Sequence, residues 1–389
     1  MINDVHDKVK AIMAESSLSA ILAFGADNVQ YLAGAPLPFL SLFPDRHVAV
    51  LWGKGEEPVA VCPDLWETTL INLSRVQRTW GYDEQPGDPA VATRAVSKLT
   101  EALVPKGGVI GVDLERVSVA LYAELKKALG EYTLVPCDSG LRGLRAVKTK
   151  EEVELLEEIA YRADQAIFGV AHHVLVTSSR TEMSLSEELR VHALERELDV
   201  VGGHAVSQGA SGENAVEFWP GAPGYGVGWN KKLCEGDFVR MEIRSTLGGY
   251  WGDATRLLTM GEPTEEQLAA YNGLSALRDA ALAAVRPGAK ASDVYAAVKA
   301  EADKRGLALV PGLAVGHGVG VSAYEPPFIS GADPTVLQIG NVLVIDPVIR
   351  TPAGELLWSK EAVVVTDSGY RRVGQYIDWR RPYVANYTL

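Results

Sequence analysis

Residues Gly236–Ile243 read GDFVRMEI, and residues Gly340–Pro347 read GNVLVIDP later in the same chain. Each stretch opens with glycine and a polar residue, continues as an apolar strand, and carries one acidic side chain at the equivalent position: Glu242 in the first and Asp346 in the second. An ionised carboxylate inside so apolar a strand is costly unless it is paired with a cation or liganded. The two stretches therefore indicate a repeated strand that contributes to a polar site.

The repeat extends to both sides of these strands. The segment HAVSQG before the first strand resembles LAVGHG before the second, which aligns Gln208 with His317. After the strands, DATRLLT resembles KEAVVVT, which aligns Asp253 with Lys360. Each half is also preceded by a pair of predicted helices, the first of which opens with a capping box, TKEE in one half and TEEQ in the other. This pattern predicts two half-domains related by a pseudo-twofold axis.

Such an axis brings equivalent strands together, so the polar residues at equivalent points are expected to converge. The alternation of side chains along a strand supports this expectation. The two acidic residues would face the axis, and their apolar neighbours would face the other side of each sheet. The residues expected to meet are Glu242, Asp253, His317, Asp346 and Lys360.

The N-terminal part of the chain has a different pattern. Short apolar strands at Ala20–Phe24, Val48–Leu51 and Val109–Val112 alternate with helical segments such as Val117–Leu129, which is typical of an α/β domain with a parallel or mixed sheet. A stretch with Pro and Gly at 136–143 marks a candidate boundary. The chain is therefore predicted to have an α+β fold with an N-terminal domain over 1–140 and a second domain over 141–389.

Composition limits the classes of function. The chain has 389 residues, 47% of them hydrophobic, and a formal net charge of −13, which disfavours nucleic acid as a partner because phosphates attract clustered Lys and Arg. Its three cysteines form no CxxC pair, and no apolar run is long enough for a signal peptide or a membrane span. A cytoplasmic protein that binds neither membranes nor nucleic acid is expected.

Several motifs resemble the superfamily of creatinase, aminopeptidase P and prolidase, whose members share the pita-bread fold. NVQYLAG (Asn28–Gly34) is similar to a motif of the family's N-terminal domain, and LRAVKTKEEVELL to the entry of its catalytic domain. GHGVG around His317 and GGYWGDATR around Asp253 resemble two motifs of the catalytic site. The resemblance implies a creatinase-like α/β domain followed by a pita-bread domain. It also implies a homodimer in which the N-terminal domain of one chain closes the cleft of the other.

The resemblance also implies where a metal site would lie. Peptidases of this family hold two divalent ions with two Asp, one His and two Glu. Position by position, Glu242 replaces the first Asp, Asp253 and His317 are kept, Asp346 replaces the first Glu, and Lys360 replaces the second. A charged ammonium has no lone pair to offer and repels cations. We therefore expect no metal or other cofactor, with a single Mn or Zn ion on the remaining ligands as the alternative.

Substrate-binding positions of the family are changed as well. The segment SGENAVEFW has Trp219 where the family has a substrate-binding His, and AYEPP has Tyr324 where the family has the His of an HExP motif, while Glu325 is kept. Creatinase is a metal-free member of the superfamily, but the resemblance implies that it depends on that His and on a carboxylate at the position of Lys360. Hydrolysis of creatine itself is therefore not expected.

Each residue of the expected site has two interpretations. Glu242 is a general base or substrate anchor, or it is a structural partner of Lys360 or Arg244. His317 is a candidate proton shuttle near neutral pH, or it is a structural histidine of the core. Lys360 is a counter-ion for the three carboxylates or an active participant, and burial and carboxylate neighbours act on its pKa in opposite directions.

Four further residues are candidates for contact with substrate, and a fifth, Tyr324, is a candidate for catalysis. Arg244 shares a strand face with Glu242 and could clamp a substrate carboxylate or remain an internal partner. Tyr324 could donate from its phenol or serve in packing. Trp358 and Trp219 could wall the pocket and attract a cationic substrate, or provide ordinary apolar lining. Glu325 is included because the HExP-like motif keeps it.

The leading hypothesis is a metal-independent, creatinase-like hydrolase that cleaves a C–N bond of a small amino-acid-derived amidine, lactam or guanidino compound. In this hypothesis the carboxylates activate a water molecule, His317 transfers the proton, and the basic side chains hold anionic groups. The alternatives are a mononuclear-metal hydrolase of the prolidase or aminopeptidase P type, a lyase or cyclase, and a non-catalytic protein on the same fold.

Overall fold

A computed structural model describes the chain except for residues 1, 35, 38–39, 41–45, 85–87, 174–179, 200–205, 212–230, 352–355 and 386–389. The chain divides into two compact units, Met1–Arg145 and Ala146–Leu389. Each unit is described by itself.

The first unit is built around one six-stranded sheet with the order β4-β3-β2-β1-β5-β6. Strand β1 pairs in parallel with β5 and antiparallel with β2, so the sheet is mixed, as the alternating pattern predicted. The strands are β1 (Ala20–Ala23), β2 (Ala49–Gly53), β3 (Val59–Pro63), β4 (Arg78–Tyr82), β5 (Val109–Val112) and β6 (Thr133–Pro136).

Helices pack against this sheet and bury its apolar side chains. Leu99 of one helix and Leu125 of another lie in the same core as Leu22 and Ile110 of the sheet. The helices are α1 (Ile2–Glu15), α2 (Ala26–Ala33), η1 (Asp64–Trp66), α4 (Glu67–Leu73), α5 (Pro89–Leu103), η2 (Leu114–Arg116), α6 (Val119–Ala128) and α7 (Asp138–Ala146).

The second unit contains the predicted repeat. Its first half has α8 (Lys150–His173), α9 (Glu182–Leu194), β7 (Val206–Ser211), β8 (Phe238–Leu247) and β9 (Tyr250–Met260). Its second half has α11 (Glu265–Ala284), α12 (Ala291–Arg305), β11 (Gly316–Gly318), β13 (Val342–Ile345) and β16 (Glu361–Thr366). The neighbour orders β7-β8-β9 and β11-β13-β16 match, strand for strand, which confirms the pseudo-twofold repeat.

Shorter strands extend these sheets. Strand β18 (Tyr383–Ala385) adds to β9, while β12 (Glu325–Phe328) and β17 (Gly369–Arg372) add to the outer edges of the second sheet. A separate three-stranded sheet contains β10 (Ala308–Leu309), β14 (Val348–Arg350) and β15 (Leu356–Trp358).

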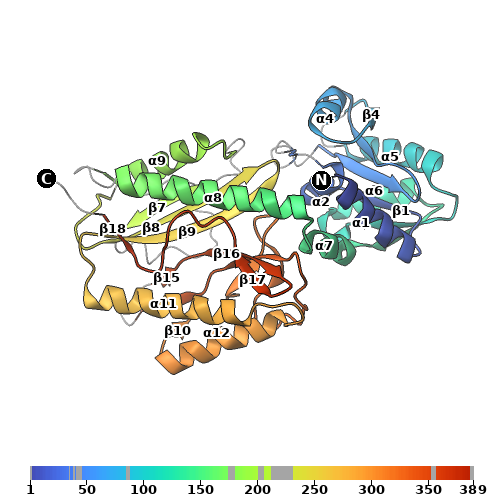
Figure 1. Cartoon of the computed structure of the whole chain (residues 1–389). Helices are drawn as coiled ribbons and strands as arrows, with labels where there is room; N and C mark the ends of the chain where they lie inside the picture. The colour runs from blue at the N-terminus through green and yellow to red at the C-terminus, as the bar shows by residue number, and fades with distance from the viewer. Residues whose placement is uncertain are drawn as a thin grey trace. The chain divides into compact units, whose positions relative to one another are not determined.

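The helices of the two halves cover opposite sides of the strands: α8 and α9 lie on one side and α11 and α12 on the other (Figure 1). Met241 and Ile243 of β8 pack into the core beneath α8 and α9, and Ile345 of β13 packs into the core beneath α11 and α12. Because side chains alternate along a strand, Glu242 and Asp346 face away from these helices, toward the space between the two halves.

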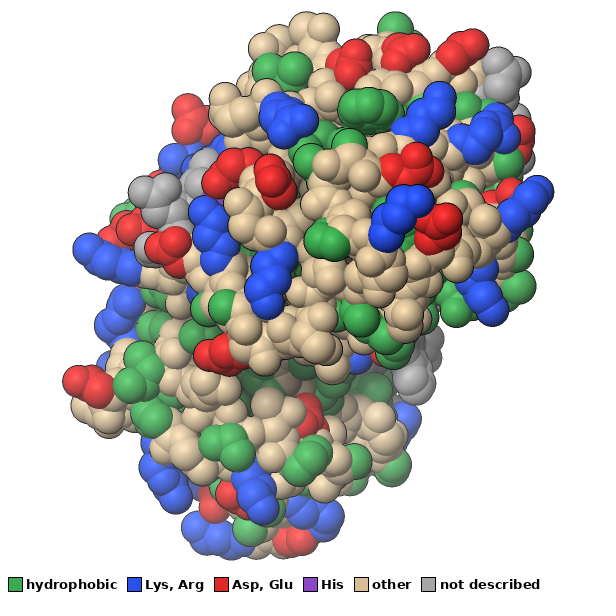
Figure 2. All heavy atoms as spheres, turned by 90° about the vertical axis from the view of Figure 1, so that its right-hand side faces the viewer, with side chains coloured by type: hydrophobic (Ala, Val, Ile, Leu, Met, Phe, Trp, Pro, Cys, Tyr) green, Lys and Arg blue, Asp and Glu red, His purple; other side chains and the backbone are tan. Residues whose placement is uncertain are grey.

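The surface has a mixed character. On the face that Figure 2 shows, acidic and basic side chains are interspersed, and Lys and Arg do not gather into one continuous area. None of the helices in the described part of the chain is both long enough and apolar enough to cross a membrane.

Candidate functional site

The two halves of the second unit meet through β9 and Lys360, the residue just before β16. The backbone N–H of Lys360 donates to the carbonyl of Thr255 at 3.2 Å, and the Arg256 guanidinium donates to the carbonyl of Lys360 at 2.5 Å. Within the first half, the antiparallel register of β8 and β9 sets Arg244 directly opposite Asp253. The equivalent residues Asp253 and Lys360 are therefore brought side by side, as the repeat predicted.

The ammonium group of Lys360 is enclosed by carboxylates. Its Nζ donates to Oδ1 and Oδ2 of Asp253 at 2.7 and 2.8 Å and to Oε1 of Glu242 at 3.1 Å. Only 3% of the lysine side chain is exposed. A protonated amine has three N–H donors, and each of them has a carboxylate oxygen within hydrogen-bond distance.

A guanidinium completes the neutralisation of these two carboxylates. Nη2 of Arg244 lies 2.8 Å from Glu242 Oε1, and its Nε lies 3.4 Å from Asp253 Oδ1. Burial acts to raise the pKa of both carboxyl groups, but Lys360 and Arg244 outweigh it and hold each pKa below its ordinary value. Arg244 is thus an internal partner of the acidic residues, which was one of its two expected roles.

A third cation, Arg240, lies behind the site and was missed from the sequence. Its side chain is fully buried, its electrostatic partners are Glu242 and Glu182, and burial lowers its pKa to about 10. The signal was present in RMEIR, because period-two alternation puts Arg240, Glu242 and Arg244 on one face of β8.

His317 occupies the other side of Asp253. Its Nδ1 lies 2.9 Å from the carbonyl oxygen of Gly318, and since a carbonyl only accepts, Nδ1 carries a proton. The other nitrogen, Nε2, lies 3.7 Å from Asp253 Oδ2 and 3.9 Å from Asp346 Oδ2. In the neutral imidazole, three atoms that carry lone pairs therefore face one another, which is stable only with a proton or a cation between them.

Asp346 differs from the other two carboxylates. Burial raises its pKa to about 6, and His317 and Lys360 only partly offset this effect. With 18% of its side chain exposed, it is also the carboxylate of this group most open to solvent. The site therefore has a half that Lys360 and Arg244 neutralise and a half, around His317 and Asp346, that has no comparable counter-charge among the described side chains.

These residues border a cavity of about 270 Å³. Tyr324 forms part of its wall, with its ring 4.2 Å from that of His317 and 56% of the residue exposed. The described lining consists of Arg244, Asp253, Leu313, Ala314, His317, Ala323, Tyr324, Asp346, Val348 and Lys360.

Two predicted substrate contacts, Glu325 and Trp358, are not in the described lining. Glu325 points elsewhere, to a buried ion pair with Lys148 in which Nζ and Oε1 are 3.0 Å apart. Trp358 is 2% exposed and packs against Arg240 instead of walling the cavity, because the side chains of β15 next to Lys360 turn into the small core of that sheet. Trp219 lies outside the described residues.

The donor set can be tested for the ions that the family resemblance implies. Two ligands about 2.1 Å from one ion at a tetrahedral angle are about 3.4 Å apart. His317 Nε2 lies 3.7 Å from Asp253 Oδ2 and 3.9 Å from Asp346 Oδ2, so it needs to approach each carboxylate by only a few tenths of an ångström to share an ion with it. The described residues contain no preformed cluster of three or more such side chains. Carboxylates repel one another when no cation lies between them, so a bound ion would draw these ligands closer together.

A second ion does not fit. It would have to contact Glu242 and Asp253, whose oxygens already accept from Lys360 and Arg244. At about 4 Å and an effective dielectric constant of 20, a dication and an ammonium repel each other by about 8 kcal/mol, twice the value for two unit charges. The residues present therefore suit one divalent ion.

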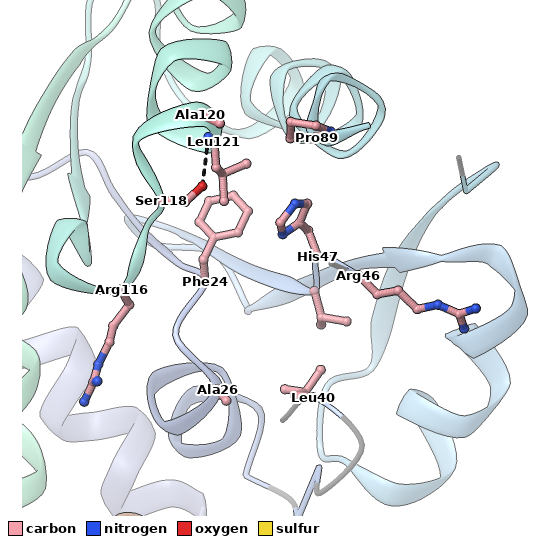
Figure 3. A pocket seen from close by; sticks show the side chains of 11 residues that line it. Phe24, Ala26, Leu40, Arg46, His47, Pro89, Arg116, Ser118, Ala120 and Leu121 are labelled. Atoms are coloured by element: carbon pink, nitrogen blue, oxygen red, sulfur yellow. Dashed lines mark hydrogen bonds between the residues drawn. The ribbon is translucent and has the colours of Figure 1, made fainter. Parts of the chain in front are cut away.

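A cavity of about 330 Å³ in the first unit lacks comparable chemistry. The residues described in its lining include no carboxylate, and the guanidinium groups of Arg46 and Arg116 point away from its centre (Figure 3). They form ion pairs with Glu84 and Asp27 at 3.2 and 2.9 Å. The site between the two halves of the second unit is the better candidate.

Comparison with known proteins gives matches over nearly the whole chain. Residues 154–370, more than half of the chain, match metallopeptidase family M24, and residues 6–147 match the creatinase/prolidase N-terminal domain. A Xaa-Pro dipeptidase from Pyrococcus furiosus is 26% identical over 373 residues, which cover 94% of this chain and 96% of that protein.

Solved structures agree on the fold. The X-Pro aminopeptidase from Thermotoga maritima superposes with a TM-score of 0.79 at 18% identity, covering 97% of this chain and 99% of that one. The prolidase from Pyrococcus horikoshii gives a TM-score of 0.75 at 22% identity, with 96% and 98% covered.

The match to a metallopeptidase family contradicts the expectation that the chain uses no cofactor. That expectation was wrong because it treated the loss of one bridging carboxylate as the loss of both ion positions. His317 and Asp346 are still present next to Asp253, with His317 Nε2 within 3.9 Å of both carboxylates. The alternative, a single divalent ion, agrees better with the match.

Proposed function

Because this chain belongs to metallopeptidase family M24 and is a hydrolase of C–N bonds, we propose that it cleaves a small amino-acid-derived substrate of the dipeptide type. We further propose that one divalent ion, Mn or Zn, is held by Asp253, His317 and Asp346. The observation that carries the proposal is the convergence of these three side chains on a small cavity, with their lone pairs facing one another.

When bound, such an ion supplies Lewis acidity and lowers the pKa of a water molecule. The remaining chemistry belongs to the chain. The hydrogen bond from Nδ1 to the Gly318 carbonyl orients the ring of His317, so that Nε2 is directed at the two carboxylates. Asp253 and His317 lie on strands β9 and β11, and Asp346 directly follows β13, so the backbone of the sheets fixes where these three side chains begin.

Two further side chains are suited to substrate. The guanidinium of Arg244 uses two of its five N–H donors on Glu242 and Asp253 and still borders the cavity, so it can face a substrate carboxylate. Tyr324 is the most exposed polar member of the described lining, and its phenol can donate a hydrogen bond to an oxygen on which charge develops. Glu242, held between two cations, serves as an anchor and is a weak base.

The test is a substrate screen with purified protein loaded with Mn or Zn. X-Pro dipeptides and other dipeptides form one panel, and lactams, amidines and guanidino compounds form a second. Release of a new amine is followed by mass spectrometry, and bound metal is measured by elemental analysis. We expect turnover in the first panel that requires about one ion per chain.

The matched control is Asp346→Asn, which keeps the shape of the side chain but removes its charge. It is expected to lose metal and activity together while keeping its fold by circular dichroism. Turnover confined to the second panel, or full activity after complete removal of metal, would contradict the proposal.

Assembly and location are separate proposals. A homodimer is expected from the resemblance to the dimeric family, and analytical ultracentrifugation tests it. Three free thiols, Cys62, Cys137 and Cys234, support a reducing compartment such as the cytoplasm. A monomeric mass at micromolar concentration would contradict the first of these two proposals.

A further inference from the structure

The amine of Lys360 lies among buried carboxylates and neutralises them as a cation. It occupies the point on the second half that corresponds to Asp253 on the first, so the pseudo-twofold axis itself directs its amine at that carboxylate. Three carboxylate oxygens from two side chains surround Nζ at 2.7, 2.8 and 3.1 Å. A small divalent ion at the position of Nζ would compete for these same three oxygens.

The charges around Lys360 are balanced without any ion. Glu242 and Asp253 supply two negative charges, and Lys360 and Arg244, both in contact with them, supply two positive charges. This charge balance does not include His317 and Asp346. His317 Nε2 lies 3.7 Å from Asp253 Oδ2 and 3.9 Å from Asp346 Oδ2, distances compatible with an ion shared through the imidazole.

We propose that the ammonium of Lys360 permanently takes one of two cation positions in this site, so that the chain binds one divalent ion, on the side of His317 and Asp346. The inference rests on the proposed metal-dependent function. It adds that a single side chain sets the number of ions. Lys360 is accordingly a positioning residue for Asp253, whose second oxygen it leaves directed at the remaining ion.

The experiment counts ions and needs no substrate. Wild type and Lys360→Glu are stripped with a chelator, titrated with Mn²⁺ by isothermal titration calorimetry, and examined by electron paramagnetic resonance. We expect one Mn²⁺ per wild-type chain, with the spectrum of an isolated ion. In Lys360→Glu we expect two ions per chain and a spectrum broadened by coupling between them.

A matched control uses the other buried lysine–carboxylate pair of this unit. Only 1% of the Lys148 side chain is exposed, and it pairs with Glu325 outside the site. Lys148→Met therefore removes a buried cation without opening a position for an ion. This variant is expected to bind one Mn²⁺, as wild type does. A change in its ion count would overturn the inference by showing that loss of any buried lysine has the same effect.

The ion counts of the first two proteins could also overturn the inference. Wild type would do so by binding two Mn²⁺ ions or none, and folded Lys360→Glu would do so by binding only one. If Lys360→Glu does not fold, Lys360→Met replaces it, and its melting temperature is expected to rise with Mn²⁺ several degrees more than that of wild type. An equal rise in both would overturn the inference. The two proposals can fail separately. If wild type binds one Mn²⁺ and Lys360→Glu binds two, but no dipeptide is cleaved, the proposed substrate is wrong and this inference stands.

Discussion

The guanidinium carbon of Arg240 lies 3.9 Å from the centre of the Trp358 ring, so the two halves of the second unit meet behind the site through a cation and an aromatic face. Both side chains are buried, Arg240 completely. Burial lowers the pKa of Arg240 to about 10, and the same loss of hydration strengthens its attraction to the indole ring. Arg240 thereby backs the face of β8 that carries Glu242.

A double-mutant cycle measures this contact. Arg240→Met and Trp358→Leu are each expected to lower the free energy of unfolding by about 3 kcal/mol, and the coupling energy between them is expected to be about 2 kcal/mol. Lys126 over Tyr122, a surface pair at 5.8 Å, is the control and should couple by about 0.5 kcal/mol. A buried pair that couples no more strongly than the control would contradict the prediction.

Lys360→Met should destabilise the metal-free protein by about 3–5 kcal/mol, because it leaves Glu242 and Asp253 buried without their main counter-ion. Urea denaturation in the presence of a chelator gives the value. Lys299→Met removes a surface lysine that pairs with Asp303 on the same helix and should cost less than about 0.5 kcal/mol. Similar losses in the two variants would show that the buried contacts contribute little.

The difference in stability between wild type and Lys360→Met should shrink in acid. Burial acts against the charged forms of Asp253 and Glu242, but Lys360 and Arg244 prevail and lower each pKa. Unfolded carboxyl groups bind protons near pH 4, so the stabilisation from this pair is complete above that pH and is lost as the pH falls further.

Asp346 contributes the opposite trend, since burial raises its pKa to about 6: its favourable contribution is present below about pH 4 and is lost as the pH rises to 6. Lys360 partly offsets the raised pKa of Asp346, so this trend should be larger in Lys360→Met than in wild type, and it too makes the difference between them smaller in acid. Unfolding free energies at several values between pH 3 and pH 7 test the prediction. A difference that does not change with pH would contradict it.

One thiol of the native protein should react rapidly with a disulfide reagent such as DTNB. Burial raises the pKa of Cys62 and of Cys137 to about 12, which leaves almost no thiolate at neutral pH, whereas Cys234 is exposed. Three thiols should react in urea. Rapid labelling of a native Cys234→Ser variant would be inconsistent with this assignment.

Tyr324→Phe should leave stability within about 0.5 kcal/mol of wild type, because the residue is largely exposed. On a substrate found by the screen, kcat is expected to fall about 10²-fold with little change in KM, as for the loss of a donor used in the transition state. Tyr370→Phe, on the outer strand β17, is the control. A kcat within twofold of wild type would assign Tyr324 to packing.

Much of the architecture follows from local patterns that a sequence displays directly. The period-two alternation in RMEIR places Glu242 and Arg244 on one face of β8, and the internal repeat pairs Asp253 with Lys360 before any coordinates are known. The capping boxes at Thr149 and Thr264 are also formed as predicted, with Glu152 and Gln267 as their partners. These features depend on neighbours close in the chain or on symmetry between the halves.

Partner choice within the site does not follow from such patterns. The period-two alternation of a strand predicts the face on which a side chain lies, but not the group that it contacts. From the sequence, Trp358 could contact the cavity or Arg240, and Glu325 could contact substrate or Lys148. Each choice depends on which oppositely charged or aromatic group lies within a few ångströms once the sheets have packed. Residues 177 positions apart, such as Lys148 and Glu325, provide no sequence signal of their contact.

The sequence by itself determined the repeat, the α/β domain before it, and the identity of the residues that meet at the axis, because periodicity and symmetry are written into the order of residues. Only the tertiary structure decided how the charges divide, with Lys360 and Arg244 neutralising Glu242 and Asp253 while His317 and Asp346 are left facing a shared space. The physical reason is that electrostatic pairing depends on distances between atoms, and packing of the two halves sets these distances.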